Sequence, residues 1–278
     1  MTPDGAIATA SVRLAAAGVE GPRAESRRLL AHVLGGGRER TLSRGAALTP
    51  EQQTQFEALL ARRAAREPLA YITGRREFWS LDFAVGPGVL IPRPDSETLV
   101  EQALGLNADK AAPLRIADLG TGSGALLIAA LSEFPHATGI GFESSPEAFA
   151  WAKANAAALM PERVEIRLAD WTEAPDAAFD LVLCNPPYIP SADIPTLQPE
   201  VRVFEPRAAL DGGPDGLAAY RALGQLLPRI LKPGGHALVE LGLGQDAAIA
   251  AMFPGLEILR IAPDLSGVAR ALVLKKAK

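Results

Sequence analysis

A regular alternation of short apolar segments with helix-length ones begins at Leu114 and constrains the fold more than any other feature. The segments of strand length are Leu114–Asp118, Ala137–Phe142, Val164–Ala169, Phe179–Cys184, His236–Leu241, Ile258–Ala262 and Val268–Lys275. The helices predicted between them are Gly124–Phe134, Pro146–Leu159 and Leu217–Leu231, the last ending at the turn 232–235. Alternating strands and helices form a mostly parallel, doubly wound sheet. The sequence therefore predicts an α/β protein with a Rossmann-like, seven-stranded sheet that closes with a hairpin.

The first part of the chain is expected to be a small helical domain. Pro3 and Pro22 each begin a helix, and the second helix is expected to end at Gly35-Gly36-Gly37. Thr49 and Gln52 form a capping-box pattern at the start of a third helix. Basic residues near the end of that helix complement its dipole, and we favour solvated surface over a binding role for them. These residues are Arg62, Arg63 and Arg66.

Residues 77–97 are predicted to join the two folded parts. Alternating apolar residues over 77–85 indicate a short hairpin. Pro92 and Pro94 then hold Arg93 in an extended connector, and Arg93 is close enough in sequence to Glu97 to form a local ion pair. The predicted domains are a helical domain at residues 1–75, a hairpin and linker at 76–97, and the α/β domain at 98–278.

Charge and composition narrow the classes of function. The formal net charge is −4, and the sequence lacks the basic tract of a protein that depends on DNA phosphates for binding. A single cysteine, Cys184, excludes an internal disulfide, and the three histidines lack metal-ligand spacing, so no metal site is expected. We see no apolar run long enough to span a membrane and no signal peptide, and we therefore expect a cytoplasmic protein.

A glycine-rich loop follows the first predicted strand and begins the next helix. Glycines are needed there because the backbone turns sharply and a ligand approaches it closely. Glu143 ends the second strand, where an acid can accept both ribose hydroxyls of an adenosine, and Trp171 follows the third strand near the expected adenine. Because NAD and S-adenosylmethionine share that ribose, the loop leaves the cofactor open. The loop residues are Gly120, Thr121, Gly122, Ser123 and Gly124, preceded by Asp118.

The tetrapeptide Asn185-Pro186-Pro187-Tyr188 follows the apolar strand 180–184 and indicates methylation of a planar nitrogen. Parallel strands end at the ligand crevice, so this loop should lie beside the cofactor. An amide or exocyclic amine is a weak nucleophile that must be held in place. The Asn185 side-chain oxygen can accept one of its N–H bonds and the Pro186 carbonyl the other. The prolines stiffen the loop, and Tyr188 offers a flat face to the planar group.

With these motifs, the sequence resembles the release-factor glutamine methyltransferases of the HemK or PrmC type. Members of this family methylate the side-chain amide (N5) of the glutamine in the Gly-Gly-Gln motif of peptide-chain release factors. The resemblance covers nearly the whole chain and includes the segments 67–74, 78–79, 90–97, 118–124, 170–171, 185–189 and 205–217. It implies a class I methyltransferase fold and S-adenosyl-L-methionine as the methyl donor. Glu143 stands where the family usually has Asp, and the extra methylene should be tolerated.

The resemblance also implies a role for each motif. Gly120 to Gly124 would hold the methionine part of the cofactor, Glu143 the ribose and Trp171 the adenine side. Asn185 would touch both cofactor and substrate. The catalytic group would be Asn185, Pro186 and Tyr188, and Pro187 would complete the glutamine pocket. The helical domain would dock the release factor, with no direct nucleic-acid or membrane partner.

Several alternatives remain open to the sequence. Related enzymes methylate a glutamine of a large-subunit ribosomal protein, although the segment Ile91–Glu97 matches the release-factor branch better. A DNA adenine-N6 methyltransferase would share the tetrapeptide, because adenine also presents a planar NH₂, but it should carry a basic recognition region. An NAD-linked oxidoreductase would leave residues 185–188 unexplained. An inactive cofactor-binding module would have no use for an intact Asn185 and Tyr188.

Overall fold

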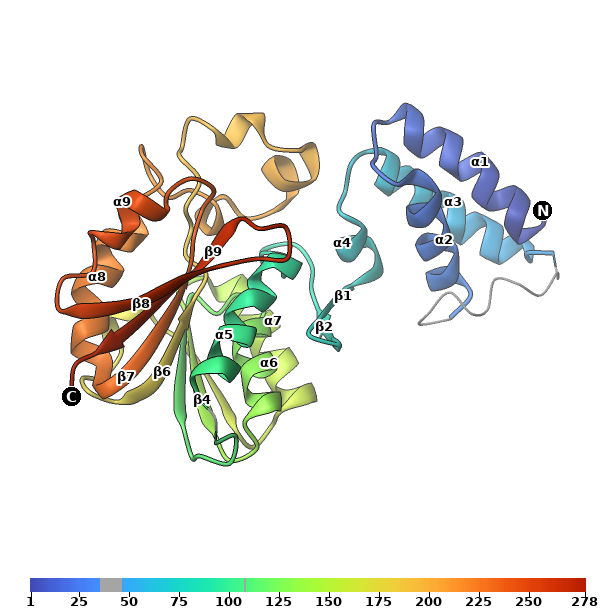
Figure 1. Cartoon of the computed structure of the whole chain (residues 1–278). Coiled ribbons are helices and arrows are strands. Elements are labelled where there is room, and N and C mark those ends of the chain that lie inside the picture. Colours follow the sequence, from blue (N-terminus) through green and yellow to red (C-terminus); the bar gives the residue numbers. More distant parts are fainter. Residues whose placement is uncertain (36–46, 108) are drawn as a thin grey trace. The chain divides into compact units, whose positions relative to one another are not determined.

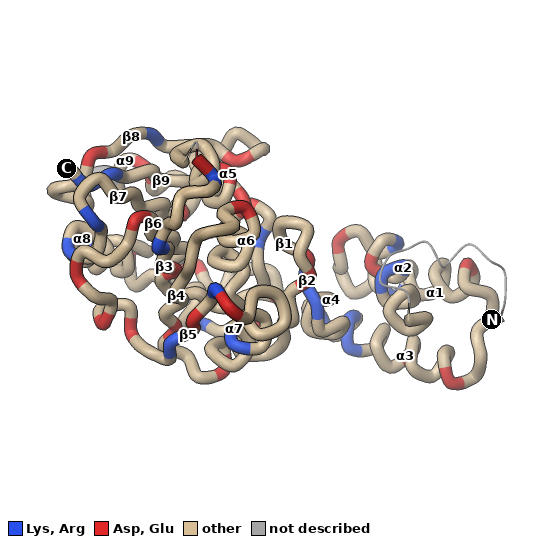
Figure 2. The backbone as a smooth tube through the Cα atoms, turned by 90° about the horizontal axis from the view of Figure 1, so that it is seen from below, with Lys and Arg blue, Asp and Glu red and all other residues tan. Residues whose placement is uncertain are grey.

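The computed structural model describes residues 1–35, 47–107 and 109–278 (Figure 1). The chain forms two compact units, Met1–Arg75 with Gln198–Phe204, and Arg76–Leu197 with Glu205–Lys278. Acidic and basic positions are interspersed in both units (Figure 2). Within the described ranges, each helix is too short or too polar to cross a membrane. Gly36 and Gly37, predicted to end the second helix, lie outside the described residues.

The smaller unit consists of the helices α1 (Pro3–Ala16), α2 (Pro22–Val33), α3 (Pro50–Ala64) and α4 (Leu69–Thr73), with the π-helical turn η5 (Glu200–Phe204). The predicted capping box is confirmed, because Thr49 Oγ1 accepts from Gln52 N at 3.3 Å and Gln52 Oε1 accepts from Thr49 N at 2.9 Å. Leucines on the inner faces of α1, α2 and α3 are fully buried and form the core of this unit. Helix α4 was not predicted, since five residues are too few to show a helical period.

The predicted solvated arginines differ from one another. Arg62 is exposed, but the Arg63 side chain is only 6% exposed and makes two ion pairs. Its Nε lies 2.6 Å from Glu25 Oε2, and its Nη2 lies 2.9 Å from Glu200 Oε1. Arg66 Nη2 contacts the other oxygen of Glu200 at 2.5 Å. The prediction of solvated surface is therefore wrong for Arg63, because acidic partners from distant segments compensate its buried charge.

Replacing Glu200 by Ala should destabilise the smaller unit by about 3 kcal/mol, because Arg63 would keep a buried charge with one partner fewer. The matched control is Glu57→Ala, which breaks an exposed pair with Arg13 and should cost less than about 1 kcal/mol. Hydrogen exchange of the α2 and α3 amides measures both effects. Equal protection in the two variants would contradict the structural role of Glu200.

The larger unit contains the predicted hairpin and the predicted seven-stranded sheet, and both are confirmed. The hairpin strands are β1 (Arg75–Phe78) and β2 (Leu81–Ala84). The sheet strands are β3 (Arg115–Leu119), β4 (Thr138–Glu143), β5 (Val164–Leu168), β6 (Phe179–Cys184), β7 (Leu231–Glu240), β8 (Leu256–Pro263) and β9 (Ala269–Lys276). Their order is β5-β4-β3-β6-β7-β9-β8. The first five strands in this order are parallel, and β9 runs antiparallel to both β7 and β8.

Helices cover both faces of this sheet (Figure 1). One face packs on α5 (Glu97–Leu106), α6 (Ala125–Glu133) and α7 (Pro146–Leu159), and the other on α8 (Ala218–Ile230) and α9 (Asp246–Ala250). Strand residues alternate between the two cores: Leu181 and Leu183 belong to the first, whereas Val182 and Cys184 belong to the second. This alternation is the period of two expected for a strand buried on both faces.

Two features of the larger unit depart from the predicted elements. Helix α5 lies in a stretch for which no helix was predicted. Strand β7 begins at Leu231, which was predicted to be the last residue of a helix, and it includes the residues 232–235 that were predicted to form a turn. The register with β6 jumps between the pairs Phe179–Leu231 and Leu181–His236, so residues 232–235 form a bulge within the strand.

Candidate functional site

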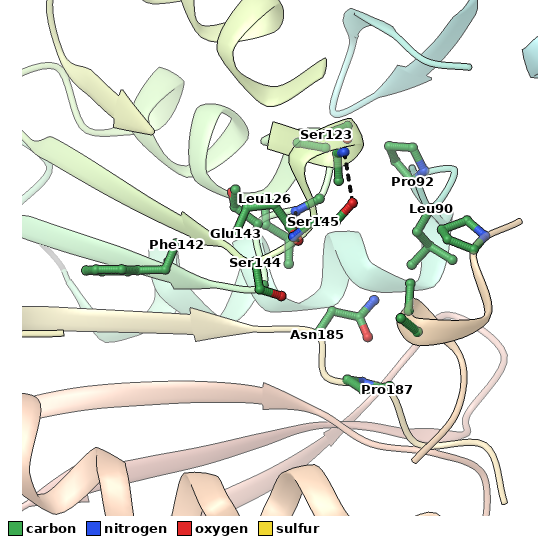
Figure 3. Close-up of a pocket in the computed structure, with 18 of the residues that line it drawn as sticks. Leu90, Pro92, Ser123, Leu126, Phe142, Glu143, Ser144, Ser145, Asn185 and Pro187 are labelled. Atoms are coloured by element: carbon green, nitrogen blue, oxygen red, sulfur yellow. Dashed lines mark hydrogen bonds between the residues drawn. The ribbon is translucent and has the colours of Figure 1, made fainter. Parts of the chain in front are cut away.

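A cavity of about 260 Å³ opens at the carboxyl ends of β3, β4 and β6 (Figure 3). Parallel sheets place their ligands at this end, at the point where the strand order reverses on either side of β3. The cavity is lined by the glycine loop, the ends of β4 and β6, and the segment before α5. Among the lining residues are Leu90, Pro92, Arg93, Ser96, Gly120, Thr121, Gly122, Ser123, Glu143, Trp171, Asn185 and Pro187.

The glycine loop turns sharply between β3 and α6. Gly120, Gly122 and Gly124 have φ values of +71°, +56° and +82°, which residues with a side chain rarely adopt. The Gly120 and Thr121 amides both donate to the Phe142 carbonyl, at 2.9 and 3.0 Å, and this ties the loop to β4. The loop therefore presents its backbone and the start of α6 to the cavity, which suits an anionic group.

Asp118 supports this loop from below. Its side chain is buried, and its Oδ2 accepts a hydrogen bond from Thr121 Oγ1 at 2.6 Å. Burial raises the pKa of Asp118 to about 7, against the lowering effect of the Thr121 hydrogen bond, and the nearby Glu143 charge raises it further. In the part of the chain that the structure describes, Asp118 is not among the cavity-lining residues, so its effect on a ligand passes through the loop.

The raised pKa predicts a stability that falls as pH rises. Asp118 contributes most below its unfolded pKa near 3.8, and this contribution is lost as pH rises through about 7. Between about pH 5.5 and about pH 8, the titration of one such group lowers the free energy of unfolding by about 2 kcal/mol. Glu240, also with a pKa raised to about 7, acts in the same direction, whereas His236, whose pKa burial lowers, acts in the opposite direction.

Thermal unfolding of the wild type and Asp118→Asn at these two pH values measures the effect. The variant cannot ionise but can still accept from Thr121, so its stability should fall less between the two pH values. An equal fall in both proteins would contradict a protonated Asp118 in the folded state.

Glu143 and Trp171 lie at the neighbouring strand ends, as predicted. Glu143 ends β4 and is 8% exposed. Its Oε2 accepts from Gly122 N at 2.8 Å, and its Oε1 accepts from Ser145 N at 2.9 Å. A carboxylate has further acceptor positions on both oxygens, and those can serve a diol. Trp171 begins the 3₁₀ turn η3 (Trp171–Glu173), which Asp170 caps.

The tetrapeptide follows β6, and its two polar side chains form hydrogen bonds to Ser96 and Glu240. Figure 3 shows Asn185 and Pro187 at the end of this strand. Asn185 Nδ2 donates to Ser96 Oγ at 3.1 Å, and the Tyr188 hydroxyl donates to Glu240 Oε1 at 3.2 Å. Burial, together with the Glu240 charge, raises the pKa of Tyr188, so its hydroxyl stays protonated. Among the residues that the structure describes, Asn185 and Pro187 line the cavity, whereas Pro186 and Tyr188 do not.

The backbone after the tetrapeptide is braced by the segment 210–216. Ile189 N donates to the Leu210 carbonyl at 3.0 Å, and Gly212 N donates back to the Ile189 carbonyl at 2.9 Å. Gln245 Nε2 donates to the Tyr188 carbonyl at 3.0 Å. Backbone approaches this close leave no room for a side chain at Gly212, where a Cβ would lie 2.8 Å from Tyr188 Cα. These contacts brace the backbone at the C-terminal end of the tetrapeptide.

The segment predicted as a connector is a wall of the cavity. Arg93 has the extended backbone expected between two prolines, with φ −99° and ψ 138°. The predicted local ion pair with Glu97 is wrong. Arg93 Nη2 instead lies 2.5 Å from Glu205 Oε1, and Glu97 Oε1 accepts from Trp79 N. The Glu205 side chain is 1% exposed, so Arg93 compensates a buried carboxylate, while Glu97 is already bound to the hairpin backbone.

Sequence reasoning missed two polar residues of the site, Ser96 and Glu240. Ser96 ends the 3₁₀ turn η2 (Pro94–Ser96), and Glu240 ends β7. Glu240 was detectable in principle, since it is a lone acid directly after the apolar run 237–239, in a strand that should end at the same edge as Asn185. Ser96 carried no such signal, because a serine before a helix is commonly only a cap.

The order of the sheet, with a glycine loop and an acidic strand end beneath the cavity, defines a Rossmann-like methyltransferase of class I. A methyltransferase from Pyrococcus furiosus shares this fold, with a TM-score of 0.51 at 17% identity, covering 80% of this chain and 98% of that one. Two family models also match, a PrmC N-terminal domain over residues 5–74 and a methyltransferase domain over residues 111–252.

Full-length relatives narrow the class to a family. A release factor glutamine methyltransferase of Rhodospirillum rubrum is 46% identical over 274 residues, which cover 95% of this chain and 82% of the relative. One from Cereibacter sphaeroides is 45% identical over 267 residues, which cover 94% of each chain. The chain therefore belongs to the release factor glutamine methyltransferase family.

Proposed function

We propose that this protein transfers a methyl group from S-adenosyl-L-methionine to the side-chain amide nitrogen (N5) of the glutamine in the Gly-Gly-Gln motif of a peptide-chain release factor. The observation that carries the proposal is Asn185, which lines the cavity with its NH₂ group bound to Ser96. The Asn185 carbonyl oxygen then remains as an acceptor for a substrate NH₂. Release factors act on ribosomes, so we place the reaction in the cytoplasm.

The residues around the cavity fit S-adenosylmethionine. Backbone amides of the glycine loop and the start of α6 suit the methionine carboxylate. The Glu143 carboxylate, oriented by two backbone N–H groups, suits the ribose hydroxyls, and Trp171 offers a flat apolar face for the adenine side. When bound, this cofactor supplies an electrophilic methyl group on a positively charged sulfur.

The chain's own residues hold and orient the nucleophile. Asn185 Oδ1 accepts one N–H of the substrate amide, and the Pro186 carbonyl accepts the other. Pro187, which lines the cavity, forms a side of the glutamine pocket, whereas Tyr188 is held by its hydrogen bond to Glu240 and is not among the described lining residues. The fixed φ of each proline keeps the Pro186 carbonyl in place. This positioning lowers the entropic part of the barrier for a weak nucleophile. The amide nitrogen can release its proton to water as or after it gains the methyl group, so no strong base is required before the attack.

The acidic residue at the end of β4 gives a direct test of the cofactor site. Glu143→Gln places an NH₂ group against one of two backbone N–H donors, so the dissociation constant for S-adenosylmethionine should rise about 10- to 100-fold. The control is Glu147→Gln, an exposed acid nearby, which should bind as the wild type does. Calorimetric titration measures both, and equal affinities would contradict the ribose role of Glu143.

The family of the chain and its helical unit both support a release factor as the protein substrate. The relatives named above are release factor glutamine methyltransferases, and the PrmC N-terminal model covers residues 5–74. We propose that this unit docks the release factor. A ribosomal-protein glutamine, the runner-up substrate, presents the same side-chain amide, so transfer to each purified protein must be compared. Faster transfer to the ribosomal protein would overturn the proposed target but leave the amide chemistry intact.

A further inference from the structure

Two buried side chains lie behind the tetrapeptide, Ser96 and Glu240. Ser96 is 3% exposed and Glu240 is 1% exposed. Ser96 Oγ donates to Glu240 Oε2 at 2.5 Å, and the other oxygen, Oε1, accepts from the Tyr188 hydroxyl at 3.2 Å. One buried carboxylate thus receives a hydrogen bond on each oxygen, from two segments that are far apart in sequence.

The direction of these hydrogen bonds determines the orientation of Asn185. A serine hydroxyl has one proton, and Ser96 gives it to Glu240. Ser96 can therefore meet Asn185 only as an acceptor, and it accepts from Nδ2 at 3.1 Å. The oxygen and nitrogen of a carboxamide occupy opposite corners of the group. An NH₂ group held at Ser96 leaves Oδ1 on the other corner, free to face a ligand.

We propose that Ser96 and Glu240 are positioning residues that fix the Asn185 amide with its oxygen toward the substrate. The inference rests on the proposed function, because the orientation matters only if the substrate presents N–H groups. An Asn185 amide rotated by half a turn would set NH₂ against NH₂, and the substrate nitrogen would lose the acceptor that aims it. Glu240 acts through Ser96 on Asn185 and directly on Tyr188, so one carboxylate aligns both side chains.

The surroundings of Glu240 make this alignment sensitive to pH. The titratable and charged groups that act on it or on which it acts are Arg270 of β9, Asp95 beside Ser96, Tyr188, Tyr220 of α8 and Cys184 of β6. Burial raises its pKa to about 7, whereas Ser96, Arg270 and Tyr188 favour the charged form. A protonated carboxyl must donate from one oxygen, and it then has one acceptor fewer for Ser96 or Tyr188. Methyl transfer should therefore rise with pH through about 7.

A double-mutant cycle with single-turnover methyl transfer to release factor tests the proposal. Ser96→Ala should slow transfer about 10- to 30-fold, and Ser96→Thr, which keeps the hydroxyl, should stay within about 3-fold of the wild type. In an Asn185→Ala background, Ser96→Ala should add less than about 2-fold, because its effect passes through Asn185. The same fold loss in both backgrounds would overturn the proposal. Glu240→Gln should make the rise in rate near pH 7 less steep than in the wild type, and a rise as steep as in the wild type would also count against it.

A second readout separates this proposal from the proposed function. The side-chain NH₂ signal of Asn185 in an NMR spectrum should shift in Ser96→Ala and stay near its wild-type position in Ser96→Thr, whatever the catalytic activity. A signal unchanged by Ser96→Ala would overturn the positioning role of Ser96. The signal could also respond as expected in a protein that transfers no methyl group to release factor. That result would support the positioning role of Ser96 and contradict the proposed function.

Discussion

Asn185→Ala should lower the rate of methyl transfer on the order of 10²-fold or more, while the fold is retained. The variant removes the acceptor oxygen and, with it, the group that Ser96 holds in place. A weak planar nucleophile then meets the methyl donor in many orientations, and the cost of ordering it appears in the barrier. Single-turnover transfer to purified release factor measures the effect, with thermal unfolding as the check on folding.

Asn107→Ala is the matched control for this experiment. Asn107 donates to the Ala103 carbonyl at the end of α5 and does not appear among the described residues that line the cavity. Its replacement should cost some helix stability but leave transfer unchanged. Transfer by Asn185→Ala at the wild-type rate would show that the assigned role is wrong.

Gly216→Ala should be nearly as damaging, although Gly216 lies outside the tetrapeptide. Its φ is +74°, and a Cβ there would collide with the Tyr188 carbonyl oxygen and lie 2.7 Å from Gln245 Nε2. These are the two partners of the hydrogen bond that braces the tetrapeptide. The backbone of Tyr188 must move to admit a methyl group, and a displacement near 1 Å at a positioned group costs about 10²-fold in rate.

Gly255→Ala separates this collision from simple backbone strain. Gly255 has a similar φ of +83°, but a Cβ there would meet nothing within 4 Å. Both variants should lose about 1 kcal/mol of stability through strain, and only Gly216→Ala should lose transfer. Stopped-flow or quench measurements of transfer, with cofactor affinity as a second value, distinguish the two. Equal activity of both variants would mean that segment 210–216 does not position the tetrapeptide.

Much of the fold was predictable because long, periodic patterns carry it. Apart from the early start of β7, the predicted strands, the helices after Pro3, Pro22 and Pro50, and the closing hairpin lie within a few residues of their predicted places. Helix α4 was too short to show a period, and α5 lies in a stretch for which no helix was predicted. The bulge at 232–235 depends on pairing with β6, which no local pattern encodes.

The candidate site was predictable where a motif lies at a strand end, and it was not where partners come from distant segments. The glycine loop, Glu143, Trp171 and Asn185 all reach one cavity, as parallel topology requires. The partners of Arg93 and Arg63 could not be read locally, since Glu205 and Glu200 come from a region with little regular structure. Ser96 and Glu240 meet only because η2 and β7 end at the same edge.

The central claim is tested most directly by identifying the methylated atom. The purified protein is incubated with isotopically labelled S-adenosylmethionine and an unmodified release factor, and the product is digested and sequenced by mass spectrometry. We expect one added methyl group on the glutamine side chain of the Gly-Gly-Gln peptide, and its loss with Asn185→Ala. A methyl group on any other residue, or label on DNA or a ribosomal protein in preference to release factor, would contradict the account.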